Sequence, residues 1–277
     1  MHPRARELAP GLWVLPLSTP TLPPATTTNT VVVAGERVVV IEPATPHLDE
    51  REVLDDVLAE LSAEGRELAA ILVTHHHPDH VGYAPELRDR HRAPIVAHPA
   101  TAARVPFAID RTADEGERLD LGDGVVLRAV FTPGHAPGHL VWVEERSNIA
   151  HAGDMVAGEG TILVDPEDAG DMGDYLDSLS RLGALATARL VPAHGPVLDD
   201  PRAIVGHYIA HRLAREAKIV GALVNGATAI DDVLARAYAD TPTFLWPLAR
   251  RALAAHLGKL VRDGRVQVEG DRVVLVS

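Results

Sequence analysis

Four of the chain's fifteen histidines lie within six positions of one segment, ILVTHHHPDHVG at residues 71–82. The apolar run LAAILVT comes directly before them and predicts a buried strand. Residues two apart in extended backbone face the same side, so His75 and His77 can bind one metal ion while His76 points elsewhere. A surface cluster or a tag-like remnant is the alternative, but neither would sit in an apolar strand followed by Pro, Asp and Gly.

Pro78 turns the chain after this pair and begins a helix, since proline is favoured in the first helical turn. Asp79 and His80 lie in that turn and can face a second ion. Two metal ions therefore explain both the types and the order of these residues.

Composition limits what such a site can be. The 277 residues include no cysteine, so disulfides are excluded and any transition-metal site must use His, Asp and Glu. With 46% hydrophobic residues, the chain can form one large globular domain or two unequal ones. No segment reaches the roughly 18 apolar residues of a membrane span, and the first residues lack a secretory core. We expect a cytoplasmic protein with no membrane partner, and the oligomeric state stays open.

The pattern HxHxDH after an apolar strand resembles the signature of the metallo-β-lactamase superfamily. Further motifs of that family follow in order, with His135 in TPGHAPGH, Asp154 in HAGD and His194 in VPAHGP. The resemblance covers about residues 12–200. It implies the α/β fold of that family, an αββα four-layer sandwich.

Carried over residue by residue, the resemblance implies a site for two divalent metal ions. The first ion would be bound by His75, His77 and His135, and the second by Asp79, His80 and His194. Asp154 would bind both ions. Imidazole and carboxylate suit zinc, with iron or manganese as alternatives. Two ions about 3.5–4 Å apart can hold a bridging hydroxide. Asp79 is the expected catalytic residue, because it could steer this nucleophile.

Other polar residues near the motifs have supporting roles in this interpretation. His139 is expected behind the ligands and His151 within a strand, while His98 either lines the cleft or caps a strand end. Each metal-bound imidazole needs a partner for its second nitrogen, and backbone carbonyls or acids near Glu42 and Asp165 are candidates. Glu42 stands in VVVIEPA, where the family usually has Asp-x-Gly. We expect metal binding to survive this departure.

Hydrophobic periodicity predicts the elements that position these residues. TNTVVVAGERVVVIEPA predicts a hairpin, and further strands are predicted in APIVAH, VVLRAVFT, LVWVEE, NIAHAGD and ARLVPAHG. Two amphipathic helices are predicted, at about 48–67 and 175–185, and a short helix is predicted in APELRDRH. The inward-facing residues of the first are Val53, Leu54, Val57, Leu58 and Leu61. Helices packed outside a sheet-rich core follow from this pattern.

The pattern changes at residue 201. Three helices are predicted, over about 201–224, 229–238 and 245–261, and the alternating segment GRVQVEGDRVVLV then predicts a hairpin. This order resembles a winged helix, whose third helix and wing would form an exposed working face. We therefore predict two domains, a metallo-β-lactamase-fold catalytic domain at 1–200 and a winged-helix-like domain at 201–277.

Several branches of the family share the metal motif. True β-lactamases generally lack the bridging aspartate, so Asp154 argues against that activity. Glyoxalase II carries a helical tail without a wing, which the C-terminal part of this chain does not resemble. The closest resemblance is to endoribonuclease-type β-lactamase-like proteins, a branch that includes polyketide-pathway thioesterases. It rests on GEGTI, DYLDSLSRL and HYIAHRLAREAKI, which begin at residues 158, 174 and 207.

Charge separates the possible substrates. Residues 1–200 hold 15 Lys and Arg against 32 Asp and Glu, a net −17, whereas residues 201–277 hold 11 against 7, a net +4. An acidic catalytic half repels a long polyanion. We therefore predict hydrolysis of a small ester, thioester or lactone, with Arg212 or Arg215 placed to pair with a substrate carboxylate.

The alternatives are an endoribonuclease for single-stranded RNA and a winged-helix binding module whose metal domain is structural. For RNA, the candidate phosphate-binding residues are Arg250, Arg251, Lys259, Arg262 and Arg265. The aromatic residues available for base stacking, Tyr238, Phe244 and Trp246, lie among Leu and Ala and are more typical of a core. A binding module would be expected to lack metal ligands, and none is missing.

Overall fold

The computed structural model describes residues 1–276, which form two compact units. The first consists of Met1–Thr132, Gly138–Ile162 and Leu185–Pro201, and the second of Pro133–Pro137, Leu163–Ala184 and residues 202–276. Compared with the predicted domains, the second unit also takes in a five-residue loop and the segment 163–184. The division at residue 200 into a catalytic and a C-terminal domain stays a prediction.

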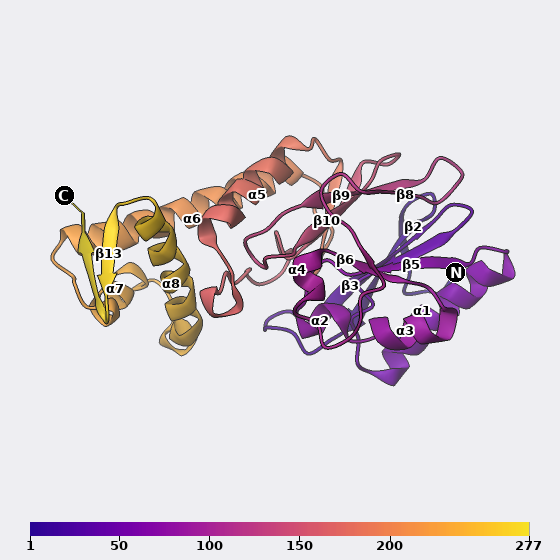
Figure 1. Cartoon of the computed structure of the whole chain (residues 1–277), viewed down its shortest axis with the longest axis horizontal. Coiled ribbons are helices and arrows are strands. Elements are labelled where there is room, and N and C mark those ends of the chain that lie inside the picture. Colours follow the sequence, from indigo (N-terminus) through magenta and orange to yellow (C-terminus); the bar gives the residue numbers. More distant parts are fainter. Residues whose placement is uncertain (277) are drawn as a thin grey trace. The chain divides into compact units, whose positions relative to one another are not determined.

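The first unit contains two sheets (Figure 1). The larger sheet keeps its strands in chain order, β1 (Arg6–Ala9), β2 (Leu12–Ser18), β3 (Thr27–Ala34), β4 (Val38–Ile41), β5 (Leu68–Leu72), β6 (Ile95–Ala97) and β7 (Arg111–Thr112). Its strands are antiparallel from β1 to β4 and parallel from β4 to β7. The carboxyl ends of β4, β5 and β6 therefore lie at the same edge.

The second sheet has five strands in the order β12-β11-β10-β9-β8. Their bounds are β8 (Arg118–Asp120), β9 (Val126–Phe131), β10 (Leu140–Glu144), β11 (Ile149–Gly153) and β12 (Arg189–Pro192). Neighbours are antiparallel except β11 and β12, which are parallel. The carboxyl ends of β9, β11 and β12 therefore share an edge, which the start of β10 also reaches.

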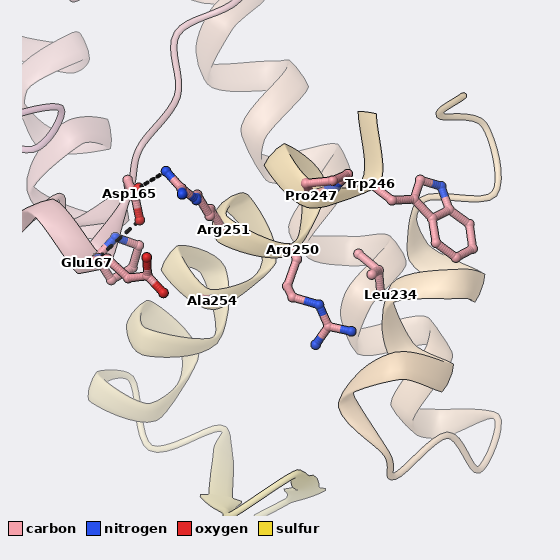
Figure 2. A pocket seen from close by; sticks show the side chains of 9 residues that line it. Asp165, Glu167, Leu234, Trp246, Pro247, Arg250, Arg251 and Ala254 are labelled. Atoms are coloured by element: carbon pink, nitrogen blue, oxygen red, sulfur yellow. Dashed lines mark hydrogen bonds and ion pairs between the residues drawn. The ribbon is translucent and has the colours of Figure 1, made fainter. Parts of the chain in front are cut away.

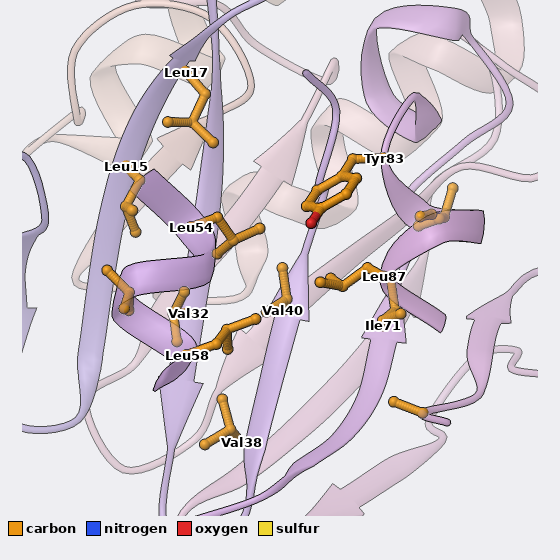
Figure 3. Packing of buried hydrophobic residues seen from close by; sticks show 14 of the residues in the cluster. Leu15, Leu17, Val32, Val38, Val40, Leu54, Leu58, Ile71, Tyr83 and Leu87 are labelled. Carbon is orange, nitrogen blue, oxygen red and sulfur yellow. The ribbon is translucent and has the colours of Figure 1, made fainter. Parts of the chain in front are cut away.

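Helices α1 (Leu48–Ala63) and α3 (Ala84–His91) cover one face of the larger sheet. All five residues predicted on the inner face of α1 are buried, and Figure 3 shows Leu54 and Leu58 of this helix among Val32 and Val40 of the sheet. The other face of the larger sheet packs on the second sheet through a second apolar cluster, which includes the fully buried Trp142. The predicted α/β arrangement of helix on sheet on sheet is confirmed. Two short helices, α2 (Pro78–Val81) and α4 (Pro99–Ala102), follow the carboxyl ends of β5 and β6.

The second unit carries the predicted C-terminal helices and hairpin. After η1 (Pro166–Asp168) and α5 (Met172–Ala184), the chain forms α6 (Pro201–Val224), α7 (Ile230–Ala237), η2 (Thr243–Leu245), α8 (Trp246–Arg262), β13 (Val266–Glu269) and β14 (Arg272–Leu275). One apolar cluster joins α6, α7, α8 and the hairpin. The three helices and the wing therefore have a core of their own. Within residues 1–276, no helix combines the length and the apolar character needed to cross a membrane.

Candidate metal centre

Strand ends of the larger sheet bring the first group of polar residues together. Glu42 directly follows β4, and Thr74 and His75 come two and three residues after β5. Because β4 and β5 are parallel neighbours, both carboxyl ends meet at one edge. His77 precedes α2, and Asp79 and His80 lie within this short helix, so Pro78 makes the predicted turn.

The second sheet supplies Asp154 and His194 in the same way. Asp154 follows β11 directly, His194 follows β12 after one residue, and the two strands are parallel. His139 precedes β10, which runs antiparallel to β11, so it lies at the same edge. The structure thus gathers residues that are more than a hundred positions apart in the chain.

Two imidazoles and two carboxylates face one another in this cluster. Nε2 of His80 lies 3.6 Å from Oδ1 of Asp79 and 3.7 Å from Oδ2 of Asp154. Nε2 of His194 lies 3.6 Å from Oδ2 of Asp79 and 3.5 Å from Oδ1 of Asp154. Ligand atoms about 2.0–2.1 Å from a tetrahedral zinc ion lie roughly 3.4 Å apart. The four side chains therefore have the spacing of a metal site.

The hydrogen-bond partner of one ring nitrogen in each imidazole shows which nitrogen is left for a metal ion. Nδ1 of His80 lies 2.7 Å from Oε1 of Glu42, and Nδ1 of His194 lies 3.0 Å from the carbonyl oxygen of Thr27. Both oxygens accept, so each Nδ1 carries a proton and each Nε2 is the atom that can offer a lone pair to a metal ion. Within residues 1–276, Nε2 of His80 is buried without a hydrogen-bond partner. A divalent cation satisfies this set of electron-rich atoms, so the residues fit the ion.

Electrostatics at His80 agree with this fit. Burial disfavours the charged imidazolium, but the carboxylates of Glu42, Asp154 and Asp79 outweigh it and raise the pKa of His80 to about 10. Burial also raises the pKa of Asp154, against the effect of His80 and His194. The cluster therefore attracts positive charge, and the carboxylate of Asp154 is costly to bury without it.

The pair predicted for the first ion also converges. Nε2 of His75 lies 2.8 Å from Nδ1 of His77. Each of these histidines has a ring nitrogen within 4.8 Å of a carboxylate oxygen of Asp154. Nδ1 of His75 lies 2.9 Å from Oγ1 of Thr74, whose hydroxyl donates to Glu42. Thr74 therefore accepts from His75 and leaves Nε2 of His75 as the ligand atom.

Glu42 connects the two groups. One of its oxygens accepts from Thr74 and from His80, and the other lies 3.3 Å from Nε2 of the buried His151. Burial opposes ionisation of Glu42, but His80, His151 and Thr74 together lower its pKa to about 2. Glu42 also adopts a left-handed backbone conformation, with φ of 55°, which is strained for a residue with a side chain. Glu42, which stands where the family usually has Asp-x-Gly, thus provides one carboxylate for both groups. It orients His80 directly and His75 through Thr74.

His135 lies on the loop Pro133–Pro137, which belongs to the second unit. Its Nδ1 lies 2.8 Å from the carbonyl oxygen of Leu163 in the same unit, so Nε2 presents the lone pair. The loop begins after Thr132 and ends before Gly138, and Thr132 Oγ1 lies 2.8 Å from Nδ1 of His139. The place of His135 in the ligand set stays a prediction from its motif.

The remaining histidines lie where their supporting roles require. Nε2 of His139 accepts from the backbone N–H of Asp154 at 3.1 Å, and burial lowers the pKa of His139 to about 3. His98 directly follows β6, as the strand-end interpretation expected, and it accepts from the N–H of Ala100 at 3.1 Å, so it caps α4; its ring stacks on Phe131. Its place in the cleft stays a prediction. His76 is half-buried beside the ring of His77, and its exclusion from the ligands stays a prediction.

Sequence reasoning missed three threonines around the site. Besides Thr74, Oγ1 of Thr28 donates to the carbonyl of Asp79 at 2.9 Å, and Oγ1 of Thr21 lies 3.4 Å from Nε2 of His194. Of these three threonines, only Thr74 could have been found from the sequence, because it directly precedes the histidines. Near Asp165, the predicted partner of an imidazole is a backbone carbonyl, that of Leu163, which accepts from His135. The Asp165 carboxylate instead caps η1 and pairs with Arg251 at 2.9 Å.

Comparisons with known proteins find similar sequences over most of this chain. Residues 23–194 match the family model described as metallo-beta-lactamase superfamily, and residues 229–273 match that of the beta-lactamase associated winged helix domain. The beta-lactamase-like protein 2 homolog of Caenorhabditis elegans is 32% identical over 257 residues, covering 87% of this chain and 80% of that protein. Lactamase-like protein adaB of Aspergillus niger is 30% identical over 236 residues, covering 79% and 70%.

Solved structures resemble nearly the whole chain. A metallo-beta-lactamase family protein from Thermus thermophilus is similar with a TM-score of 0.80 at 25% identity, covering 98% of this chain and all of that one. A beta-lactamase domain protein from Burkholderia ambifaria shares the fold with a TM-score of 0.82 at 21% identity, covering 98% and 93%.

Proposed function

The chain belongs to the metallo-beta-lactamase superfamily, and on that basis we propose that it is a two-metal hydrolase for a small ester, thioester or lactone. The observation that supports this most directly is the cluster of His80, His194, Asp79 and Asp154. Its facing atoms lie 3.5–3.7 Å apart, and the second nitrogens of both imidazoles are held by acceptors.

The proposed ligand set keeps the sequence assignment, in which Asp154 is shared by both ions. The other members are His75, His77 and His135 for the first ion, and Asp79, His80 and His194 for the second. The structure supports the grouping of the members in the first unit, whereas His135 is assigned on its motif. Zinc is the proposed metal because the donors are imidazole and carboxylate.

When bound, a pair of divalent ions supplies a water with a pKa near ~7 and positive charge that polarises a carbonyl group. The chain's own residues orient this chemistry. Glu42 and Thr74 fix the rings of His75 and His80 through the contacts described above. Asp79 is half-buried, and burial opposes its ionisation, but His80, Thr21 and His194 outweigh this effect and lower its pKa. The carboxylate is therefore ionised and can align the attacking water. A small acyl substrate needs no further charged machinery.

The contacts of the second unit favour this substrate class over RNA. All five basic residues considered for phosphate binding pair with acids within the unit. Their partners are Asp231 for Arg250, Asp165 for Arg251, Asp263 for Lys259, Asp171 for Arg262 and Glu216 for Arg265. Figure 2 shows the side chain of Arg251 directed at Asp165. A polyanion would have to displace these carboxylates, which disfavours binding.

Other side chains of the second unit differ in part from their predicted roles. Arg215 pairs with Asp240 at 2.7 Å, and Arg212 is only 5% exposed over the ring of Tyr175, so both are engaged within the unit, and pairing with a substrate carboxylate stays a prediction. Tyr238 is buried, as expected of a core aromatic. Phe244 is 79% exposed, so its assignment to the core was wrong.

A single assay tests the proposal. Zinc-loaded protein is offered a panel of acyl thioesters, esters and lactones and, separately, single-stranded RNA, each with and without a chelator. We expect chelator-sensitive hydrolysis of at least one acyl class and no RNA cleavage. The Asp79→Asn, Asp154→Asn double variant should lose the acyl activity, because it removes both carboxylates that face the histidines.

Two results would overturn the proposal. Chelator-sensitive RNA cleavage that the double variant abolishes would replace the acyl function with the nuclease. Two bound ions without turnover of either class would favour the binding module with a structural metal domain. RNA cleavage that persists in the double variant would be scored as contamination and would not count for the nuclease.

A further inference from the structure

The loop that carries His135 is held by α5 and by Asp171, the residue before this helix. The backbone N–H of Asp171 donates to the carbonyl oxygen of Gly134 at 2.8 Å, and Oγ of Ser178 donates to that of Pro133 at 2.6 Å. Gly134 has φ of 130°, and a Cβ there would overlap the backbone of Tyr175. The residue before His135 thus lies directly on the first turn of α5. Its position follows from that of the helix.

Asp171 orders this first turn. Its Oδ1 accepts from the backbone N–H groups of Gly173 at 2.8 Å and Asp174 at 2.9 Å, which a helix leaves without partners in its own ladder. The same residue therefore caps α5 through its side chain and holds Gly134 through its backbone. Disturbing the Asp171 carboxylate changes the turn against which the His135 loop rests.

A residue of the winged helix secures Asp171. Nη2 of Arg262, the last residue of α8, donates to Oδ1 of Asp171 at 2.6 Å, and Nη1 lies 3.3 Å from Oδ1 of Asp174. The guanidinium lies against Gly173, where any Cβ would overlap it. A side chain at this position would therefore displace the guanidinium from the place that it occupies here. The arginine that the sequence suggested for RNA phosphate is engaged within its own unit.

We propose that Arg262 and Asp171 are positioning residues for His135, so that the winged helix sets the affinity of the first metal site. The proposal rests on the two-metal function proposed above, because it requires His135 to be a ligand. It gives the C-terminal helices a role that needs no nucleic acid. Residues behind metal ligands typically change metal affinity by roughly 10–100-fold when replaced.

The test is a stepwise zinc titration of chelator-treated full-length protein, with Co²⁺ absorption spectra and hydrogen exchange at residues 163–175. Asp171→Ala should lower the zinc affinity of one of the two sites by roughly 10–100-fold, and Arg262→Met should lower it by up to about tenfold. Both should speed exchange of the Asp171 amide. Asp171→Asn keeps the cap without the charge, so it should resemble Arg262→Met and guards against a folding defect of the alanine variant.

Arg250 and Asp231 provide a matched control, since they form an ion pair between α8 and the first turn of α7. Arg250→Met and Asp231→Ala should leave both ions and the exchange of Asp171 unchanged. His135→Ala and His194→Ala mark the loss of the first and the second ion.

Two outcomes distinguish a failure of this inference from a failure of the proposed function on which it rests. If wild-type protein binds two ions and His135→Ala loses one, but Arg262→Met and Asp171→Ala titrate like the controls, the positioning role is wrong and the function stands. If wild-type protein binds fewer than two ions, or His135→Ala loses none, the ligand set fails and the positioning role falls with it.

Discussion

Replacing Asp154 by asparagine should reduce hydrolysis by roughly a hundredfold to a thousandfold, the range seen when a preorganised electrostatic group is removed. The carboxylate of Asp154 faces His80 at 3.7 Å and His194 at 3.5 Å, and it also lies near the ligand atoms of His75 and His77. Asparagine keeps the shape and removes the charge that both ions would share. Metal content by mass spectrometry should fall below two per chain together with the rate.

Stability should change in opposite directions with and without metal. Because burial raises the pKa of Asp154, its ionised carboxylate costs free energy in the metal-free fold. Asp154→Asn should therefore raise Tm in chelator and lower it in excess zinc, where the wild type gains binding energy. Asp110→Asn is the control, since Asp110 belongs to the first unit and its Oδ2 accepts the backbone N–H of Ile95 at 2.9 Å. Wild-type metal content and rate in Asp154→Asn would contradict the bridging role.

Glu42→Gln should weaken both metal ions by roughly 10–100-fold. The carboxylate accepts from His80 and from Thr74, which in turn holds His75, so one change disturbs a ligand of each ion. A neutral amide also presents a donor group to side chains that donate themselves. Stepwise zinc titration and the fall in kcat/KM at limiting zinc measure the effect.

Two variants sharpen this result. Thr74→Val should weaken only the ion bound by His75, since Thr74 is the link on that side. Glu144→Gln is the matched control, because Glu144 is also buried in the first unit but accepts from the N–H groups of Arg146 and Ser147 in a turn. Equal zinc affinities in Glu42→Gln and Glu144→Gln would rule out the role assigned to Glu42.

Short-range patterns in the sequence determined much of this protein. Alternation along a strand predicts that His75 and His77, but not His76, bind metal, and this stays a prediction because β5 already ends at Leu72. Proline starts the helix that carries Asp79 and His80, an effect that depends only on neighbouring residues. Periodicity likewise identified the buried face of α1 and the order of the C-terminal helices and hairpin. The family motifs then predicted the distant ligands in order.

Only the tertiary structure decided which residues contact the predicted ligands or the segment that holds the His135 loop. Glu42 and His80 are 38 positions apart, Thr27 and His194 are 167 apart, and Arg262 and Asp171 are 91 apart. No local spacing encodes such pairs, because they depend on which strand ends and helix termini meet after folding. The same reason explains the tail arginines. Sequence shows their charge, but their acidic partners become visible only when α7, α8 and the segment before α5 are folded into one unit.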